Sequence, residues 1–393
     1  MILLQDHTSV DIVSPYLAGW FFDQGEGSEI YGFAASEQFS ALPPPAWRDA
    51  AQARGFTGTY LTPYLYAPLW AAVLAPVAAH FTIAAFVAAV FTFQIPLIFI
   101  SMFLCWHLAG RPGWFSFWAG ISSLLFFTNA GGLLALSENQ PQITVFFLVL
   151  LGFWLFQIRY FRWAGLVFAL AASLKITPLV FGLLFVAKKQ WQGAAVMLAA
   201  GTLLLGASFF LAGFSLHTQF YEQIQNISGH VFVSRHNWSL SSLLFQLQND
   251  TGWREDVPMY LISETPGWIR IFTSSLFMAG LIGFVVLFSK SNTKRQQFRV
   301  FLALIVLIGL VSPLGWSHNF LPLIYAAPVF LIGQSPRAAL LLLIGIFSAQ
   351  SLALQLTFAA MATGQNWGQI GGTLSIIFAL LVILWDARKT NSE

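Results

Sequence analysis

Long apolar runs separated by short polar stretches dominate the chain. A helix of about 20 apolar residues crosses the hydrocarbon core of a bilayer, so the pattern predicts an all-α polytopic membrane protein with about eleven transmembrane helices. The runs cover residues 82–107, 115–134, 142–158, 161–176, 178–187, 192–213, 270–289, 299–313, 320–334, 337–361 and 367–386.

Two stretches depart from this simple pattern. The runs 161–176 and 178–187 are short and meet at Lys175-Ile-Thr-Pro178, which is typical of a broken or V-shaped pair of helices. The stretch from Tyr64 to His80 contains two prolines, and we interpret it as a non-spanning, interfacial helix.

The runs divide the chain into four segments. We expect an extracytoplasmic N-terminal loop with an interfacial helix over 1–81, transmembrane helices over 82–213, a second extracytoplasmic loop over 214–269, and C-terminal transmembrane helices over 270–393. The two outer loops are expected to cap a cavity. Export of the N-terminal loop needs a preceding span, so we also expect a transmembrane helix upstream of Met1, which makes the complete protein twelve-spanning.

Composition excludes a soluble domain and a nucleic-acid partner. Hydrophobic residues make up 57% of the chain and charged residues 8%, whereas a soluble domain has about 25% charged residues. The net charge is only +3, and the basic residues form no continuous stripe. Cys105 lies in an apolar run, and we interpret it as a small buried hydrophobe.

The charges also predict an orientation. Twelve Lys and Arg residues lie in one set of loops and five in the other, with Lys175 left inside the membrane. The side with the excess is expected to be cytoplasmic. Only Asp386 and Glu393 are carboxylates on that side, and the other thirteen lie opposite. The sequence therefore predicts that acid–base chemistry takes place on the outer face.

Six motifs of polar and proline residues follow one another along the predicted outer side. They are DIVSPY (11–16), TPYLYAP (62–68), SENQPQ (137–142), LKITP (174–178), NWSL (237–240) and SPLGWSHN (312–319). In this order they resemble glycosyltransferase family 87, the bacterial polyprenyl-phosphate-mannose-dependent mannosyltransferase-like proteins of the GT-C superfamily. The chain departs from the family pattern at Ala67, Pro141 and Asn319, and the family's first transmembrane helix is absent. These departures bear on the acceptor site and on activity rather than on the fold.

The resemblance implies a GT-C-type fold and a membrane glycosyltransferase. Such an enzyme transfers a hexose, by resemblance mannose, from a polyprenyl-phosphate sugar donor to a glycan or glycolipid acceptor, with inversion. It implies no metal and no cofactor. The expected location is the bacterial inner (plasma) membrane, with the site on the periplasmic or extracellular side of the lipid bilayer.

Asp11 is the candidate general base. A carboxylate just outside the membrane can take the proton from a sugar hydroxyl as that oxygen attacks the donor. The leaving phosphate is already a stable anion, so the second acid that glycoside hydrolysis uses is not required. The alternative is a solvated loop acid or a helix N-cap.

Lys175 and His318 are candidates for binding the donor phosphate. A Lys near the bilayer centre costs about 2.5–3.5 kcal/mol, and a lipid phosphate next to the helix break at Pro178 supplies a counter-ion. Alternatively, Lys175 extends to the interface or pairs with Glu138. His318 can donate to phosphate or orient the acceptor, or it has a structural role.

Neutral groups in the motifs are candidates for binding the substrate. Gln142, Asn237 and Ser239 suit sugar hydroxyls, although they suit unpaired loop backbone equally well. The resemblance adds Tyr16 to this group. Two further candidates are Glu138, as a second acid, and Arg235, as a phosphate contact.

Two other functions remain open. A transporter or lipid flippase also has a broken helix with a buried charge, but it should show repeated halves, and we find no repeat in the sequence. A non-catalytic membrane relative of the family is the other alternative.

Overall fold

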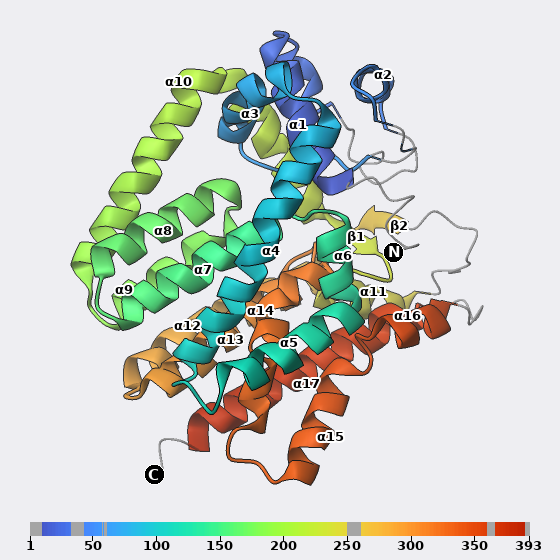
Figure 1. Cartoon of the computed structure of the whole chain (residues 1–393). Coiled ribbons are helices and arrows are strands. Elements are labelled where there is room, and N and C mark those ends of the chain that lie inside the picture. Colours follow the sequence, from blue (N-terminus) through green and yellow to red (C-terminus); the bar gives the residue numbers. More distant parts are fainter. Residues whose placement is uncertain are drawn as a thin grey trace.

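A computed structural model of the chain describes residues 10–32, 43–56, 58, 61–249, 261–359 and 366–389. These residues are mostly helical (Figure 1). Two short strands, β1 (His230–Val233) and β2 (Leu261–Glu264), pair antiparallel with His230 opposite Glu264. The predicted all-α fold class is confirmed.

Four described helices are long and apolar enough to cross a membrane: α4 (Ile83–Leu108), α10 (Trp191–Gly229), α12 (Gly267–Lys290) and α17 (Trp367–Lys389). A fifth candidate is the pair of α6 (Ala130–Ser137) and α7 (Gln142–Gln157), whose axes differ by 112°. Large apolar side chains on α10 are exposed, including Leu203 at 74% and Phe210 at 88%. Surfaces of this kind face lipid more readily than water.

The remaining apolar runs form shorter helices. They are α5 (Phe115–Thr128), α8 (Phe161–Leu174), α9 (Gly182–Ala187), α13 (Lys294–Val311), α15 (Pro336–Phe347) and α16 (Leu352–Ala359). Between α8 and the 3-10 helix η3 (Thr177–Phe181), Lys175 is extended, so the break expected at this position is present.

Two stretches differ from the predicted pattern. Residues 320–334 were expected as one span but divide into the end of η4 (Ser317–Phe320), then α14 (Leu321–Tyr325) and η5 (Ala327–Leu331). Pro322 and Pro328 interrupt a continuous helix because proline lacks the backbone N–H. Residues 214–229, expected in a loop, continue α10 beyond a kink at Gly213, whose φ of 73° favours glycine.

The N-terminal helices form a separate small core at one end of the molecule (Figure 1). They are α1 (Val10–Asp23), η2 (Gly27–Glu29), α2 (Pro45–Ala53) and α3 (Pro68–His80). The helices α1 and α3 approach closely, since a Cβ added at Gly19 would lie 2.8 Å from the carbonyl carbon of Leu74. This contact fixes the second half of α1 against α3.

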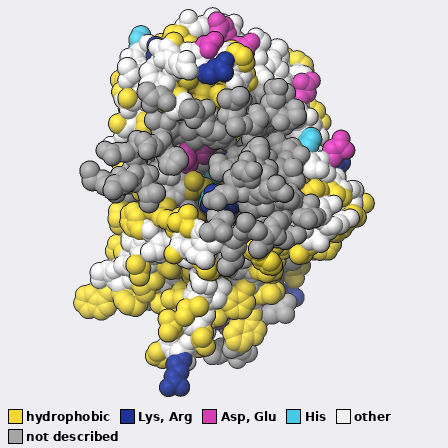
Figure 2. Space-filling view, turned by 90° about the vertical axis from the view of Figure 1, so that its right-hand side faces the viewer, with side chains coloured by type: hydrophobic (Ala, Val, Ile, Leu, Met, Phe, Trp, Pro, Cys, Tyr) yellow, Lys and Arg dark blue, Asp and Glu magenta, His cyan; other side chains and the backbone are white. Residues whose placement is uncertain are grey.

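The main core joins α4, α7, α8, α13 and α17. Phe153 of α7 stacks on Phe301 of α13 with a centroid separation of 3.9 Å. A buried ion pair links Arg299 of α13 to Asp386 of α17 at 2.6 Å. Figure 2 shows acidic side chains toward the top of one face and apolar side chains across its lower half.

Candidate active site

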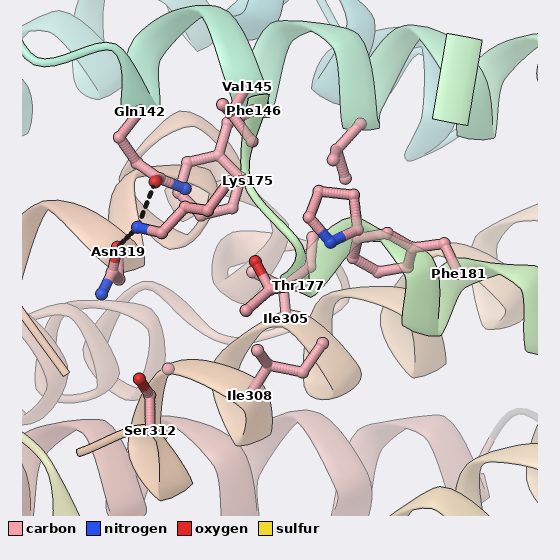
Figure 3. A pocket seen from close by; sticks show the side chains of 13 residues that line it. Gln142, Val145, Phe146, Lys175, Thr177, Phe181, Ile305, Ile308, Ser312 and Asn319 are labelled. Atoms are coloured by element: carbon pink, nitrogen blue, oxygen red, sulfur yellow. Dashed lines mark hydrogen bonds between the residues drawn. The ribbon is translucent and has the colours of Figure 1, made fainter. Parts of the chain in front are cut away.

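Lys175 lies where three distant segments of the chain meet. Its Nζ donates to Oε1 of Gln142 at 2.7 Å and to Oδ1 of Asn319 at 3.2 Å (Figure 3). Lys175 follows the last residue of α8, Gln142 is the first residue of α7, and Asn319 lies in η4. Both acceptors are neutral amides, so neither neutralises the ammonium charge.

A pocket of about 440 Å³, including its open part, extends from Lys175 between α7, η3 and α13 (Figure 3). Its polar groups lie on one side, where Gln142 and Asn319 bond Lys175 and Ser312 lies farther along, toward Ile308. The remaining walls are mainly apolar. They consist of Val145, Phe146, Val149, Thr177, Pro178, Phe181, Ile305, Ile308 and Gly309. Such a pocket suits a ligand with an anionic head and an apolar tail.

Asp11 lies in the first turn of α1 and is mostly buried. Burial, and then the negative charge of Glu138, raise the pKa of Asp11 to about 7, against a lowering effect of Thr62 and Lys175. Asp11 therefore lies close enough to both Glu138 and Lys175 for their charges to act on it. A carboxyl group with a pKa near neutrality is suited to accept a proton.

The loop between α6 and α7 places the side chain of Gln140 against Asp11. The side-chain amide of Gln140 donates to the carboxylate of Asp11. Gln94, from the middle of α4, donates to the carbonyl oxygens of Asn139 at 3.2 Å and Gln140 at 3.0 Å. Asn139 in turn donates to Val87 of α4 at 2.9 Å. A transmembrane helix therefore fixes the loop that contacts the candidate base.

His318 is 5% exposed and lies in η4 beside Asn319. Burial, and then the positive charge of Lys175 and the neighbouring His236, hold its pKa well below the usual value. Sequence reasoning missed His236 and the contact of Gln140 with Asp11. His236 is adjacent to the predicted Arg235, and Gln140 lies within a recognised motif, but neither position alone indicated a contact.

Of the predicted site residues, only Gln142 and Lys175 line the pocket. The Tyr16 hydroxyl donates to the carbonyl oxygen of Phe81 at 2.6 Å, at the contact of α1 with the end of α3. Asn237 donates to the carbonyl oxygen of Phe232 at 2.6 Å, and Ser239 caps α11 (Leu240–Gln248). These contacts favour the backbone-satisfying role that the sequence left open for Asn237 and Ser239.

The three departures from the family pattern have different positions. Ala67 precedes the first residue of α3, and Pro141 precedes Gln142 at the start of α7. Asn319 lies in the site itself, where it accepts from Lys175 and donates to the carbonyl oxygen of Leu314 at 2.7 Å. Of these three residues, only Asn319 lines the pocket.

Comparison with known proteins identifies the family. The sequence profile of glycosyltransferase family 87 matches residues 64–313. The chain belongs to glycosyltransferase family 87. Membership makes it a membrane glycosyltransferase, with a sugar donor and an acceptor as its substrates. No curated protein matches the chain.

The family 87 match covers part of the candidate site. Gln142 and Lys175 lie within the matched residues, as do all the apolar walls of the pocket. Asp11 and His318 lie outside it, on either side. Their assignment therefore depends on the motifs and on the geometry around Lys175.

Proposed function

We propose that this family 87 protein transfers a hexose, by resemblance mannose, from a polyprenyl-phosphate sugar to a glycan or glycolipid acceptor. The transfer takes place on the outer face of a bacterial inner membrane and inverts the anomeric centre. Asp11 is the general base, and Lys175 binds the donor phosphate, with His318 beside it.

The observation that carries the proposal is the amphipathic pocket below Lys175. Its polar end contains an ammonium group whose hydrogen-bond acceptors are two neutral amides. Its other walls are apolar side chains from α7, η3 and α13. A polyprenyl phosphate has the same division, with the phosphate at the ammonium and the first isoprene units along the apolar walls.

The reaction follows from this arrangement. The acceptor hydroxyl oxygen attacks the anomeric carbon of the donor from the face opposite the phosphate. A new bond forms between carbon and that oxygen while the bond between carbon and phosphate oxygen breaks. Asp11 takes the hydroxyl proton, and the polyprenyl phosphate leaves as an anion with its charge stabilised by Lys175.

The test is a transfer assay with purified protein. Labelled polyprenyl-phosphate mannose is incubated with a panel of glycolipid acceptors, and the label is followed into the acceptor. We expect mannosylated product with the opposite anomeric configuration from the donor, formed about 10²–10⁴ times more slowly by the Asp11→Asn variant. Transfer of the label from a nucleotide sugar instead, or retention of configuration, would contradict the proposal.

A further inference from the structure

Four buried polar atoms beside the site have no hydrogen-bond partner among the residues that the structure describes. They are Arg235 Nε, His236 Nδ1, Ser317 Oγ and His318 Nδ1. Unpartnered buried polar atoms are rare because each has lost its hydrogen bonds with water. Their concentration in two pairs of neighbouring residues indicates a ligand that supplies the missing partners.

The two pairs form one rigid wall. The backbone N–H of Ser317 donates to the carbonyl oxygen of His236 at 2.7 Å, and that of Trp238 donates to Gly315 at 2.8 Å. The helix α6 supports this wall from behind, since a Cβ added at Gly131 would lie 2.7 Å from the Ser317 carbonyl oxygen. The unpartnered atoms are therefore held in place before any ligand binds.

The protonation states of His236 and His318 indicate the kind of ligand. Burial, and then the charge of Arg235, lower the pKa of His236 to about 3, and the pKa of His318 is also well below its usual value. Each imidazole is therefore neutral, with one donor and one acceptor nitrogen. A sugar hydroxyl has the same two capacities, whereas an anion would favour charged imidazoles.

We propose that Arg235, His236, Ser317 and His318 form an acceptor subsite that binds the hydroxyls of a glycan. The proposal rests on the proposed function, because it assigns the second substrate to the same site. His318 joins this wall to the donor pocket, since it precedes Asn319, which lines that pocket and accepts from Lys175 at 3.2 Å.

A binding experiment tests the subsite without requiring transfer. The probes are octyl α-mannoside and octyl phosphate, which share one apolar tail, titrated into the full-length protein in a detergent without sugar. The variants are His236→Ala and Ser317→Ala, and the second removes a single oxygen atom. Matched controls are His230→Ala and Ser228→Ala, whose side chains contact the carbonyl oxygens of Asn226 and Ile224 near the end of α10.

We expect the mannoside to bind the wild type and to bind each variant about five to ten times more weakly, with both controls unchanged. Octyl phosphate should bind both variants as it binds the wild type. Three results would overturn the subsite: no mannoside binding to the wild type, no loss with Ser317→Ala, or a loss of octyl phosphate with His236→Ala. Mannoside binding with the expected losses, but no transfer from any lipid donor, leaves the subsite and removes the proposed function.

Discussion

The side-chain amide of Gln140 donates a hydrogen bond to the carboxylate of Asp11, across 129 positions of the sequence. Gln140 is 6% exposed, and its backbone is held by Gln94 of a transmembrane helix. Donation to the ionised carboxylate favours that form over the neutral acid. This contact opposes the burial and the Glu138 charge that raise the pKa of Asp11 to about 7.

The contact predicts a pH dependence. Only ionised Asp11 can accept a proton, so kcat/KM should fall tenfold per pH unit below about pH 7 and level off above it. Gln140→Leu removes the contact that favours the ionised form, so the falling limb should move to higher pH. Gln52→Leu, on the exposed surface of α2, is the control. A profile of Gln140→Leu that is lower at every pH but not displaced would show a role in folding only.

The position of Gln140 also shows what the sequence could and could not predict. The break at Lys175 was predictable because a lysine and a proline interrupt an apolar run. The approach of Gln140 to Asp11 was not, because it depends on how α1 packs above α4 and α6. His236 was missed for a similar reason, since its neighbours Ser317 and His318 are distant in sequence and are joined to it by tertiary contacts.

The helices, too, could be predicted from the sequence only in part. Hydropathy identified most apolar runs, but it does not distinguish one continuous helix from the three short helices η4, α14 and η5. It also ended α10 at the last apolar residues, although the helix continues to Gly229. Hydropathy records which residues avoid water, whereas the hydrogen bonds of the backbone decide where a helix ends.

Lys175→Ala should weaken binding of the donor. Loss of a charge-assisted contact costs about 1.5–3 kcal/mol, so the Kd for polyprenyl-phosphate mannose should rise roughly 10-fold to 150-fold. Lys175→Arg should restore binding only in part, because a planar guanidinium cannot reproduce the contacts of a compact ammonium with Gln142 and Asn319. Lys290→Ala, at the exposed end of α12, is the control. Equal donor affinity in the Ala variant would place the phosphate elsewhere.

The apolar walls predict a dependence on the lipid chain. Ile308→Trp fills part of the pocket below Lys175, so a long-chain donor should bind about tenfold more weakly, a loss of about 1.4 kcal/mol. A donor with a single isoprene unit should be affected less. Ile344→Trp, at a position of α15 that is 51% exposed, should leave both affinities unchanged. Equal losses for the two donors would show that the lipid does not enter this pocket.

The proposed orientation can be tested by labelling. Cysteines introduced at Glu222 on α10 and at Thr293 before α13 are both exposed, and the native Cys105 is buried. A membrane-impermeant maleimide added to intact cells should label position 222 and not position 293, because the excess of basic residues marks the cytoplasmic side. After permeabilisation both should react. The opposite result in intact cells would place the whole site on the cytoplasmic face.

Asp11→Asn tests the central step. The substitution is nearly isosteric and keeps an acceptor oxygen for Gln140, but the amide cannot take a proton. Positioned proton transfer contributes about 10²–10⁴ in rate, so kcat should fall on that scale while the Kd for the donor changes little.

Asp23→Asn is the matched control, because Asp23 ends the same helix and is exposed. Its turnover should equal that of the wild type. Glu138 is the group able to replace Asp11 as a base, since its charge acts on Asp11 directly. If Asp11→Asn retains activity that Glu138→Gln abolishes, then Glu138 is the group that accepts the proton. Asp11 would then only help to position the Glu138 carboxylate.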